Sequence, residues 1–233
     1  MTFHTCNDCG TSSPICFMKK ILLTALVCWA GLLPAQQAGV RSFVWGGMVG
    51  FESQLLGIQS TSTSEPDHMH VESGRAAHGA CMGIFGRWPL WKGVFLQQGV
   101  SLSTLQAKVD FYPDGPEYYS FTDLELPLHI VLTNPVDEDA PLRGSFLLGA
   151  RVSWNFAPQN IDNLYFLRER LAVDAGLGVE IRLKNWRFQP ELVYSLGLNN
   201  LHDVTNAPYD WVVGRVVRDK LTLRLLFWRN SGH

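Results

Sequence analysis

Eight segments of this sequence alternate apolar and polar side chains with a period of two residues, five of them clearly and the first three, at 42–55, 77–88 and 94–109, more faintly because glycine or glutamine interrupts the pattern. In the clearest of them, residues 171–183, every second side chain is aliphatic, whereas the intervening positions hold Asp174, Glu180 and Arg182 among smaller residues. Successive side chains of a β-strand point to opposite faces, so this pattern predicts a strand with one wholly aliphatic face. The predicted strands cover residues 42–55, 77–88, 94–109, 121–132, 142–154, 171–183, 187–199 and 219–228.

A closed membrane barrel is the fold that accommodates eight such strands. No apolar run of about 18 residues follows Gln37, so the sequence beyond that residue excludes a membrane-spanning helix. Within hydrocarbon only a closed sheet satisfies every backbone donor and acceptor, and eight is the smallest common strand number for such a sheet. We therefore predict an all-β protein, an eight-stranded antiparallel up-and-down transmembrane β-barrel preceded by a cleaved signal peptide.

The composition agrees with this class of protein. Hydrophobic residues make up 46% of the 233 residues and charged residues only 17%, against about 25% in soluble globular proteins. Such a chain buries enough apolar surface to fold. Its formal net charge of −2 does not provide the basic face that binding to a phosphate backbone demands. We therefore expect outer-membrane lipid as a partner, and no nucleic acid.

The N-terminal region has the features of a secretory signal. Met18, Lys19 and Lys20 form a basic head before an apolar run over residues 21–33, and cleavage is predicted after Ala35. Because the head begins at Met18, the residues before it are predicted to be an upstream extension from a start codon assigned too early. The predicted domains are the extension 1–17, the signal peptide 18–35 and the outer-membrane β-barrel domain 38–230.

The connections between the predicted strands alternate in length. The long connections are residues 57–74, 110–120, 156–168 and 200–217, and the short ones are 89–93, 133–141 and 184–186. All long connections therefore lie at one end of the barrel. Outer-membrane barrels have short periplasmic turns and longer outer loops, which predicts an outer-membrane location with a periplasmic amino terminus.

The inner face of the predicted barrel is strongly charged. Six acidic residues point inward, namely Glu52, Asp123, Glu125, Asp174, Glu180 and Glu191. Five arginines accompany them, namely Arg87, Arg143, Arg151, Arg182 and Arg224. Buried charges are tolerable only when paired and hydrogen-bonded, so we predict a plugged ion-pair core without an open pore.

Aromatic residues lie near the ends of the predicted strands. They are Trp45, Trp88, Trp91, Trp154, Tyr194 and Trp228. This placement is typical of the aromatic girdles at membrane surfaces, and ordinary core aromatics are the alternative.

Three sequence stretches resemble the PorT family of outer-membrane β-barrels from Bacteroidetes-type bacteria. They are DAGLGVEIR at 174–182, FQPELVYSLGLNN at 188–200 and LELPL at 124–128, and the lysine-headed signal is similar too. The resemblance implies a barrel without catalytic residues. It also implies a role in type IX secretion, the export of proteins across the outer membrane, with partners among secretion proteins of the periplasm or outer membrane.

Candidate chemical sites are few. His68, His70 and His78, near Glu65 and Asp67, are most simply solvated side chains of an outer loop, although such residues can bind a divalent metal. A second candidate is a general base, His129, oriented by Glu125 on the same strand face. No serine nucleophile in a strained elbow accompanies it, so a hydrogen-bonded lumen histidine is the favoured interpretation. Cys81 is the single cysteine of the predicted mature chain, which excludes an internal disulfide.

We therefore expect no enzyme, and no catalytic, cofactor-binding or metal-binding residues. The favoured function is a non-catalytic secretion accessory of PorT type. A small binding or adhesion barrel with ligand-contacting outer loops and a lipid-modifying outer-membrane enzyme remain as alternatives.

Overall fold

A computed structural model describes residues 43–60, 70–73, 76–112, 114–134, 140–157, 164–203 and 212–229. The predicted signal peptide, residues 18–35, and the extension before it lie outside these ranges. In the described part of the chain, no helix has the length and apolar character needed to cross a membrane.

Eight long strands form the barrel, and each lies where the sequence predicts one. They are β1 (Val44–Ser60), β3 (Ala77–Trp91), β4 (Val94–Tyr112), β5 (Gly115–Thr133), β6 (Leu142–Asn155), β8 (Glu169–Leu183), β9 (Trp186–Gly197) and β11 (Val213–Arg229). Neighbours pair in the order β4-β3-β1-β11-β9-β8-β6-β5, and β5 pairs with β4 to close the ring. All of these pairings are antiparallel, which confirms the predicted eight-stranded barrel.

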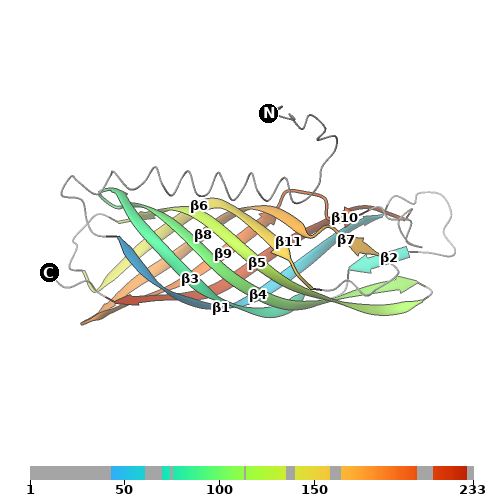
Figure 1. Ribbon diagram of the computed structural model, residues 1–233, viewed down its shortest axis with the longest axis horizontal. Coiled ribbons are helices and arrows are strands. Elements are labelled where there is room, and N and C mark those ends of the chain that lie inside the picture. The colour runs from blue at the N-terminus through green and yellow to red at the C-terminus, as the bar shows by residue number, and fades with distance from the viewer. Residues whose placement is uncertain are drawn as a thin grey trace, which may run out of the picture. The chain divides into compact units, whose positions relative to one another are not determined.

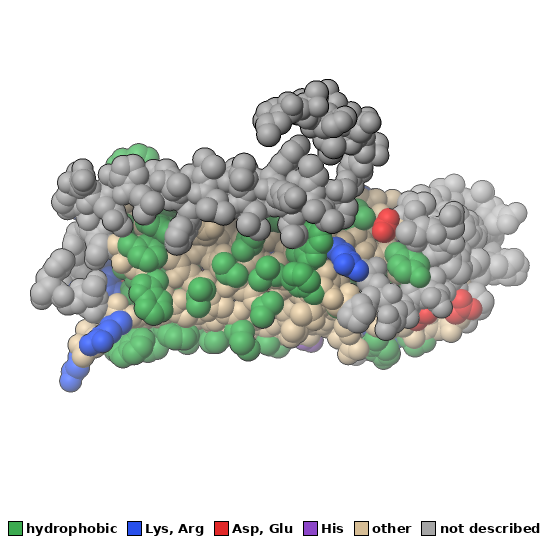
Figure 2. All heavy atoms as spheres, in the orientation of Figure 1, with side chains coloured by type: hydrophobic (Ala, Val, Ile, Leu, Met, Phe, Trp, Pro, Cys, Tyr) green, Lys and Arg blue, Asp and Glu red, His purple; other side chains and the backbone are tan. Residues whose placement is uncertain are grey.

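The outer wall of the barrel is apolar. Leu177 of β8 faces its cross-strand partner Leu192 of β9, and the two side chains are 63% and 48% exposed. Comparable exposed leucine, isoleucine, valine and phenylalanine side chains occur on the other long strands. Figure 2 shows hydrophobic side chains along the visible flank. An exposed apolar surface that continues around a closed barrel is the surface that hydrocarbon requires.

The outer parts of β4 and β5 reverse this polarity without a change in strand phase. The inward pair Ser103 and Asp123 is followed toward the hairpin tip by the inward pair Leu105 and Phe121. Outward positions become polar over the same step. Each strand has 19 residues, whereas a tilted transmembrane strand needs about 9–11. The hairpin therefore projects beyond the membrane and has an apolar inner face.

The predicted long connection at residues 110–120 is wrong, because the projecting strands occupy most of it. Residues 110–120 form the tip of the β4–β5 hairpin, in which β4 ends at Tyr112 and β5 begins at Gly115. The φ of Gly115 is +102°, a left-handed conformation that glycine adopts without a steric penalty and that allows the tight turn. Projecting strands thus replace the loop, and they leave the barrel at the same end as the other long connections.

Three short strands lie at this end of the barrel, as Figure 1 shows. β2 (His70–Ser73) pairs with the outer part of β4, while β7 (Tyr165–Phe166) pairs with β10 (His202–Asp203). Phe166 contacts the inner face of the β4–β5 hairpin, with its ring 4.9 Å from that of Tyr119 and 5.6 Å from that of Phe121. Together with buried residues of β1 and β11, these side chains form an apolar cluster at the outer end of the lumen.

The aromatic prediction is wrong for one residue. Trp45 and Trp91 are both 72% exposed, as a girdle requires. Trp228 instead points inward, because it has the same strand parity as Thr222 and Arg224. It forms a second apolar cluster inside the barrel with Met48, Phe85 and Leu226. The alternative interpretation, a core aromatic, therefore holds for Trp228.

The apolar belt yields a stability prediction. Leu177→Arg places a charge near the middle of the belt, so we expect it to lower the free energy of unfolding in lipid by about 2–4 kcal/mol. Tyr118→Arg is the matched control, because Tyr118 is 57% exposed on the projecting hairpin and should tolerate the charge. Denaturant titration of the barrel in lipid vesicles measures both variants. Equal losses would contradict the assignment of the belt.

Candidate functional site

The lumen of the described barrel holds a large set of buried charged side chains. Six carboxylates and six cations are buried there. They are Glu52, Asp123, Glu125, Asp174, Glu180 and Glu191, with Arg87, Arg151, Arg170, Arg218, Lys220 and Arg224. The two signs balance, as a buried ionic cluster requires.

Lys220 of β11 lies at the centre of this network. Its ammonium donates to Glu52 Oε1 at 2.9 Å and also to Glu125 Oε1, so one cation joins carboxylates from β1 and β5. Ser103 of β4 donates to the second oxygen of Glu52. All four side chains are buried. The contacts thus connect four strands across the lumen.

Arg151 of β6 extends the network toward β8. Its guanidinium donates to Glu125 Oε2 at 2.6 Å and, through Nε, to Asp174 Oδ2 at 2.9 Å. The same Asp174 oxygen lies 2.8 Å from His129 Nε2. A Cβ at Gly149 would lie only 2.0 Å from the Leu128 carbonyl oxygen and 2.8 Å from His129 Cδ2, so this close approach requires glycine.

The network continues toward the short-turn end. Arg224 Nε donates to Glu191 Oε2 at 2.6 Å, and Gln189 Nε2 donates to the other oxygen of Glu191 at 2.9 Å. Gln189 Oε1 accepts a hydrogen bond of 3.0 Å from Arg87, whose Nε also donates to Gln97. The Arg87 guanidinium lies 5.1 Å from the centroid of the Trp228 ring. At this end the ionic network contacts the second apolar cluster, which contains Trp228.

Arg218 links the network to the outer apolar cluster. Its guanidinium forms an ion pair with Asp123. It also donates a hydrogen bond of 3.0 Å through Nε to Gln54 Oε1. The same group lies 4.2 Å from the centroid of the Phe121 ring. Arg170 donates to the Arg218 carbonyl oxygen at 3.0 Å and 3.2 Å. The charged layer is thus enclosed between apolar clusters at both ends.

The predicted lumen set is largely observed. All six acidic residues and Arg87, Arg151 and Arg224 are buried in the network. Arg143 and Arg182 are only half-buried, because they lie near the short-turn ends of β6 and β8. The missed cations are Arg170, Arg218 and Lys220. Lys220 has the same parity as Arg224 within the predicted strand, so alternation alone would have found it.

The other candidate residues are placed as follows. His129 is 1% exposed and contacts Asp174, whereas Glu125 contacts Arg151 and Lys220. Glu125 therefore does not orient His129, and the favoured interpretation, a buried and hydrogen-bonded lumen histidine, is confirmed. His78 is exposed and stacks on Phe51. The remainder of the predicted histidine loop, residues 65–68, and the side chain of residue 70 lie outside the described part.

Metal-ligating and thiol side chains complete the description of the candidate residues. Within the described ranges, no group of three or more histidine, cysteine, aspartate or glutamate side chains is placed to hold a metal ion. Cys81 is a buried free thiol in the same described part. Its side chain lies beside Gly50, whose Cβ, if present, would lie 2.9 Å from the Cys81 sulfur.

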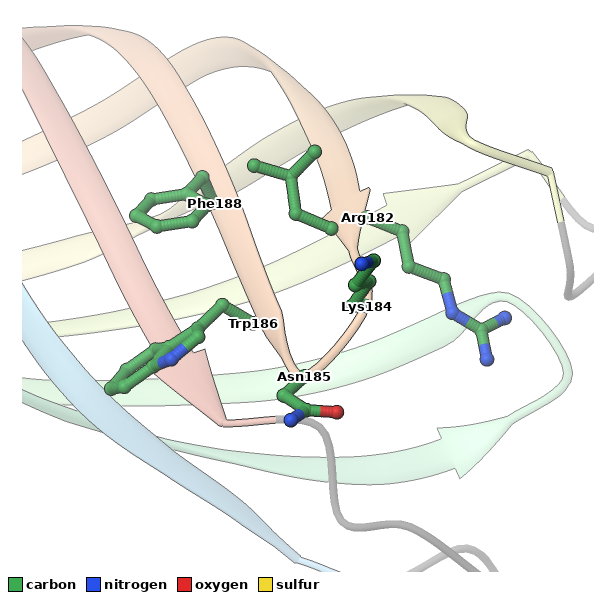
Figure 3. A pocket seen from close by; sticks show the side chains of 6 residues that line it. Arg182, Lys184, Asn185, Trp186 and Phe188 are labelled. Atoms are coloured by element: carbon green, nitrogen blue, oxygen red, sulfur yellow. The ribbon is translucent and has the colours of Figure 1, made fainter.

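A surface hollow lies at the opposite end from the projecting hairpin, where β8 turns into β9. Arg182, Leu183, Lys184, Asn185, Trp186 and Phe188 line it. In Figure 3, Trp186 and Phe188 point to one side of the turn and Arg182 points to the other. The hollow therefore lies on the rim of the barrel and is separate from the ionic network.

Comparisons with known proteins identify the fold. No known protein family and no curated protein matches this sequence. The barrel is similar to the outer-membrane protein OprG from Pseudomonas aeruginosa, with a TM-score of 0.52 and 9% identity over 82% of this chain and 96% of that one.

Two other solved structures are more distant. AlkL, an outer-membrane protein determined in lipid bilayers, has a TM-score of 0.48 and 10% identity over 85% of this chain and 96% of that one. Neisserial surface protein A has a TM-score of 0.44 and 10% identity over 82% of this chain and 100% of that one. The similarity to OprG assigns this chain the fold of an outer-membrane β-barrel.

The central lysine yields a second stability prediction. Lys220→Met leaves Glu52 and Glu125 buried without their shared cation, so we expect a loss of about 3–5 kcal/mol in the free energy of unfolding. Lys108→Met is the control, because Lys108 pairs with Asp110 on the exposed hairpin and should cost no more than about 1 kcal/mol. Urea unfolding of the lipid-embedded barrel compares the two. A loss for Lys220→Met as small as the control would show that this ion pair does not stabilise the barrel.

Proposed function

We propose that this protein is a non-catalytic, non-conducting barrel of the outer membrane that serves a protein-secretion assembly. The filled lumen carries this proposal. Lys220, Arg151 and Arg224 connect carboxylates from facing strands, and apolar clusters lie above and below them. A barrel whose interior is occupied by its own side chains acts through its surfaces. An accessory role in a membrane assembly is consistent with that constraint.

The sequence resemblance supports the particular assembly. The stretches at 124–128, 174–182 and 188–200 resemble the PorT family, which implies a role in type IX secretion. In this assignment the short turns face the periplasm and the β4–β5 hairpin faces outward. The burial of His129 and its contact with Asp174 support the absence of a catalytic role, because a substrate would have to displace the lumen network to reach it.

A binding or adhesion barrel is the second candidate, and the projecting hairpin favours it. Tyr112 and Tyr118 are 55% and 57% exposed on the outer face of this hairpin. Exposed aromatic side chains on a rigid strand pair are suited to contact another surface, because tyrosine provides a large contact area at low entropic cost.

Deletion of the gene distinguishes the two functions. The proposal predicts that cargo accumulates in the periplasm of the deletion strain and that the wild-type gene restores secretion, because the assembly requires this barrel. Immunoblotting of culture medium and periplasm measures the effect. Secretion that continues unchanged in the deletion strain would contradict the proposal.

The matched control is the deletion strain that carries the gene of the double variant Tyr112→Ser and Tyr118→Ser in place of the wild-type gene. The double variant alters only exposed side chains, so the barrel should assemble normally. If this variant restores secretion, the secretion role does not depend on the two tyrosines. The binding barrel would instead be supported by two results together: the deletion strain still secretes its cargo, and cells that carry the double variant no longer attach to an external surface.

A further inference from the structure

The rim of the barrel at the β8–β9 turn has a layered arrangement of side chains. Across β8, β9 and β11, Leu183 pairs with Trp186, and Trp186 pairs with Arg229. All three are exposed on the outer wall. The next outward row toward the membrane centre is wholly apolar and consists of Ile181, Phe188 and Phe227. The apolar belt therefore ends at the row that contains Trp186.

Tryptophan at the end of an apolar belt marks the level of the lipid headgroups. Trp186 is 47% exposed, and its ring lies 6.5 Å from that of Phe188. Lys184 precedes Trp186 in the turn that joins β8 to β9, and Arg229 is the register partner of Trp186 on β11, so cationic residues flank Trp186 on both sides along the rim. Lipid phosphates occupy the same level of the bilayer, so the charge of this rim is complementary to them.

The backbone at Lys184 is unusual. Its φ is +33°, and no other non-glycine residue in the described part of the chain has a positive φ. A long side chain in this conformation is sterically disfavoured, and glycine would adopt it at a lower cost. The two-residue turn between β8 and β9 requires a positive φ at its first residue, and Lys184 occupies that position in place of glycine. In Figure 3, Lys184 lies between Arg182 and the aromatic pair, on the wall of the hollow.

We propose that Lys184, Trp186 and Arg229 bind the phosphate of a membrane phospholipid in the leaflet at the short-turn end. Arg229 offers a planar pair of donors and Lys184 a compact ammonium, both suited to a phosphate group. The indole N–H of Trp186 is a third donor, and its ring faces the boundary region. The acyl chains lie against Leu183 and Phe188. This site depends on the transmembrane placement of the barrel and is independent of the secretion role.

Native mass spectrometry of the full barrel released from detergent micelles tests the site. The probes are phosphatidylglycerol and a diacylglycerol with the same acyl chains but no phosphate. We expect the wild-type protein to retain phosphatidylglycerol preferentially. Each cation near a membrane surface contributes about a fivefold gain, so Lys184→Gln or Arg229→Gln should weaken retention about fivefold and the pair about 25-fold. Lys108→Gln, at the opposite end, is the control and should leave retention unchanged.

Two additional measurements separate the site from simpler explanations. Lys184→Gly should weaken phosphatidylglycerol retention without lowering the thermal unfolding midpoint, because glycine relieves the strained turn; this excludes misfolding as the cause. Excess inorganic phosphate should displace little lipid, because the site also holds the acyl chains. Equal retention of phosphatidylglycerol and diacylglycerol would overturn the proposal. So would equal losses in Lys184→Gln and Lys108→Gln, or full displacement of the lipid by inorganic phosphate.

Discussion

The need to satisfy every backbone hydrogen bond within hydrocarbon determines this structure. β1 pairs with β11 and β4 pairs with β5, so each of the eight long strands has a neighbour on both sides. In a closed sheet, the side chains of each strand point alternately outward, away from the barrel, and inward, into the lumen. Apolar side chains therefore face lipid, and the remaining polar side chains face a lumen too narrow to hydrate them freely. Ion pairing across the lumen follows from closure of the ring.

The polarity reversal on β4 and β5 has the same physical basis. Inside the membrane the solvent is apolar, so Leu102 and Leu124 face outward; beyond it the solvent is water, and Leu105 and Phe121 face inward. Strand phase is unchanged while the solvent changes. The inward residues beyond the membrane cap the charged layer, and Met48, Phe85, Leu226 and Trp228 cap its other end. A barrel filled in this way leaves its rims and its outer wall as its exposed surfaces.

The sequence predicts the strands and faces well, because a period of two is a local property. It predicts individual charged partners poorly. Glu125 contacts Arg151 because of the register between β5 and β6, and it contacts Lys220 because β11 lies across the lumen from β5; both contacts depend on the whole ring. Arg170 and Arg218 escape prediction for a different reason: the real strands begin earlier than the apolar alternation does. The tip of the projecting hairpin, residues 110–120, is predicted to be a loop because its outward residues are largely polar.

Site-directed spin labelling along β5 tests the central claim most directly. Single labels at residues 118–132 are introduced in a cysteine-free background, and their collision rates with oxygen and a water-soluble nickel chelate are measured in lipid vesicles. The structure predicts oxygen-rich, nickel-poor signals at outward positions Leu124, Leu128 and Leu132, and nickel access at Tyr118 and Ser120. Nickel access at Leu128, or a signal that does not alternate between adjacent residues, would contradict a closed barrel whose apolar face contacts lipid.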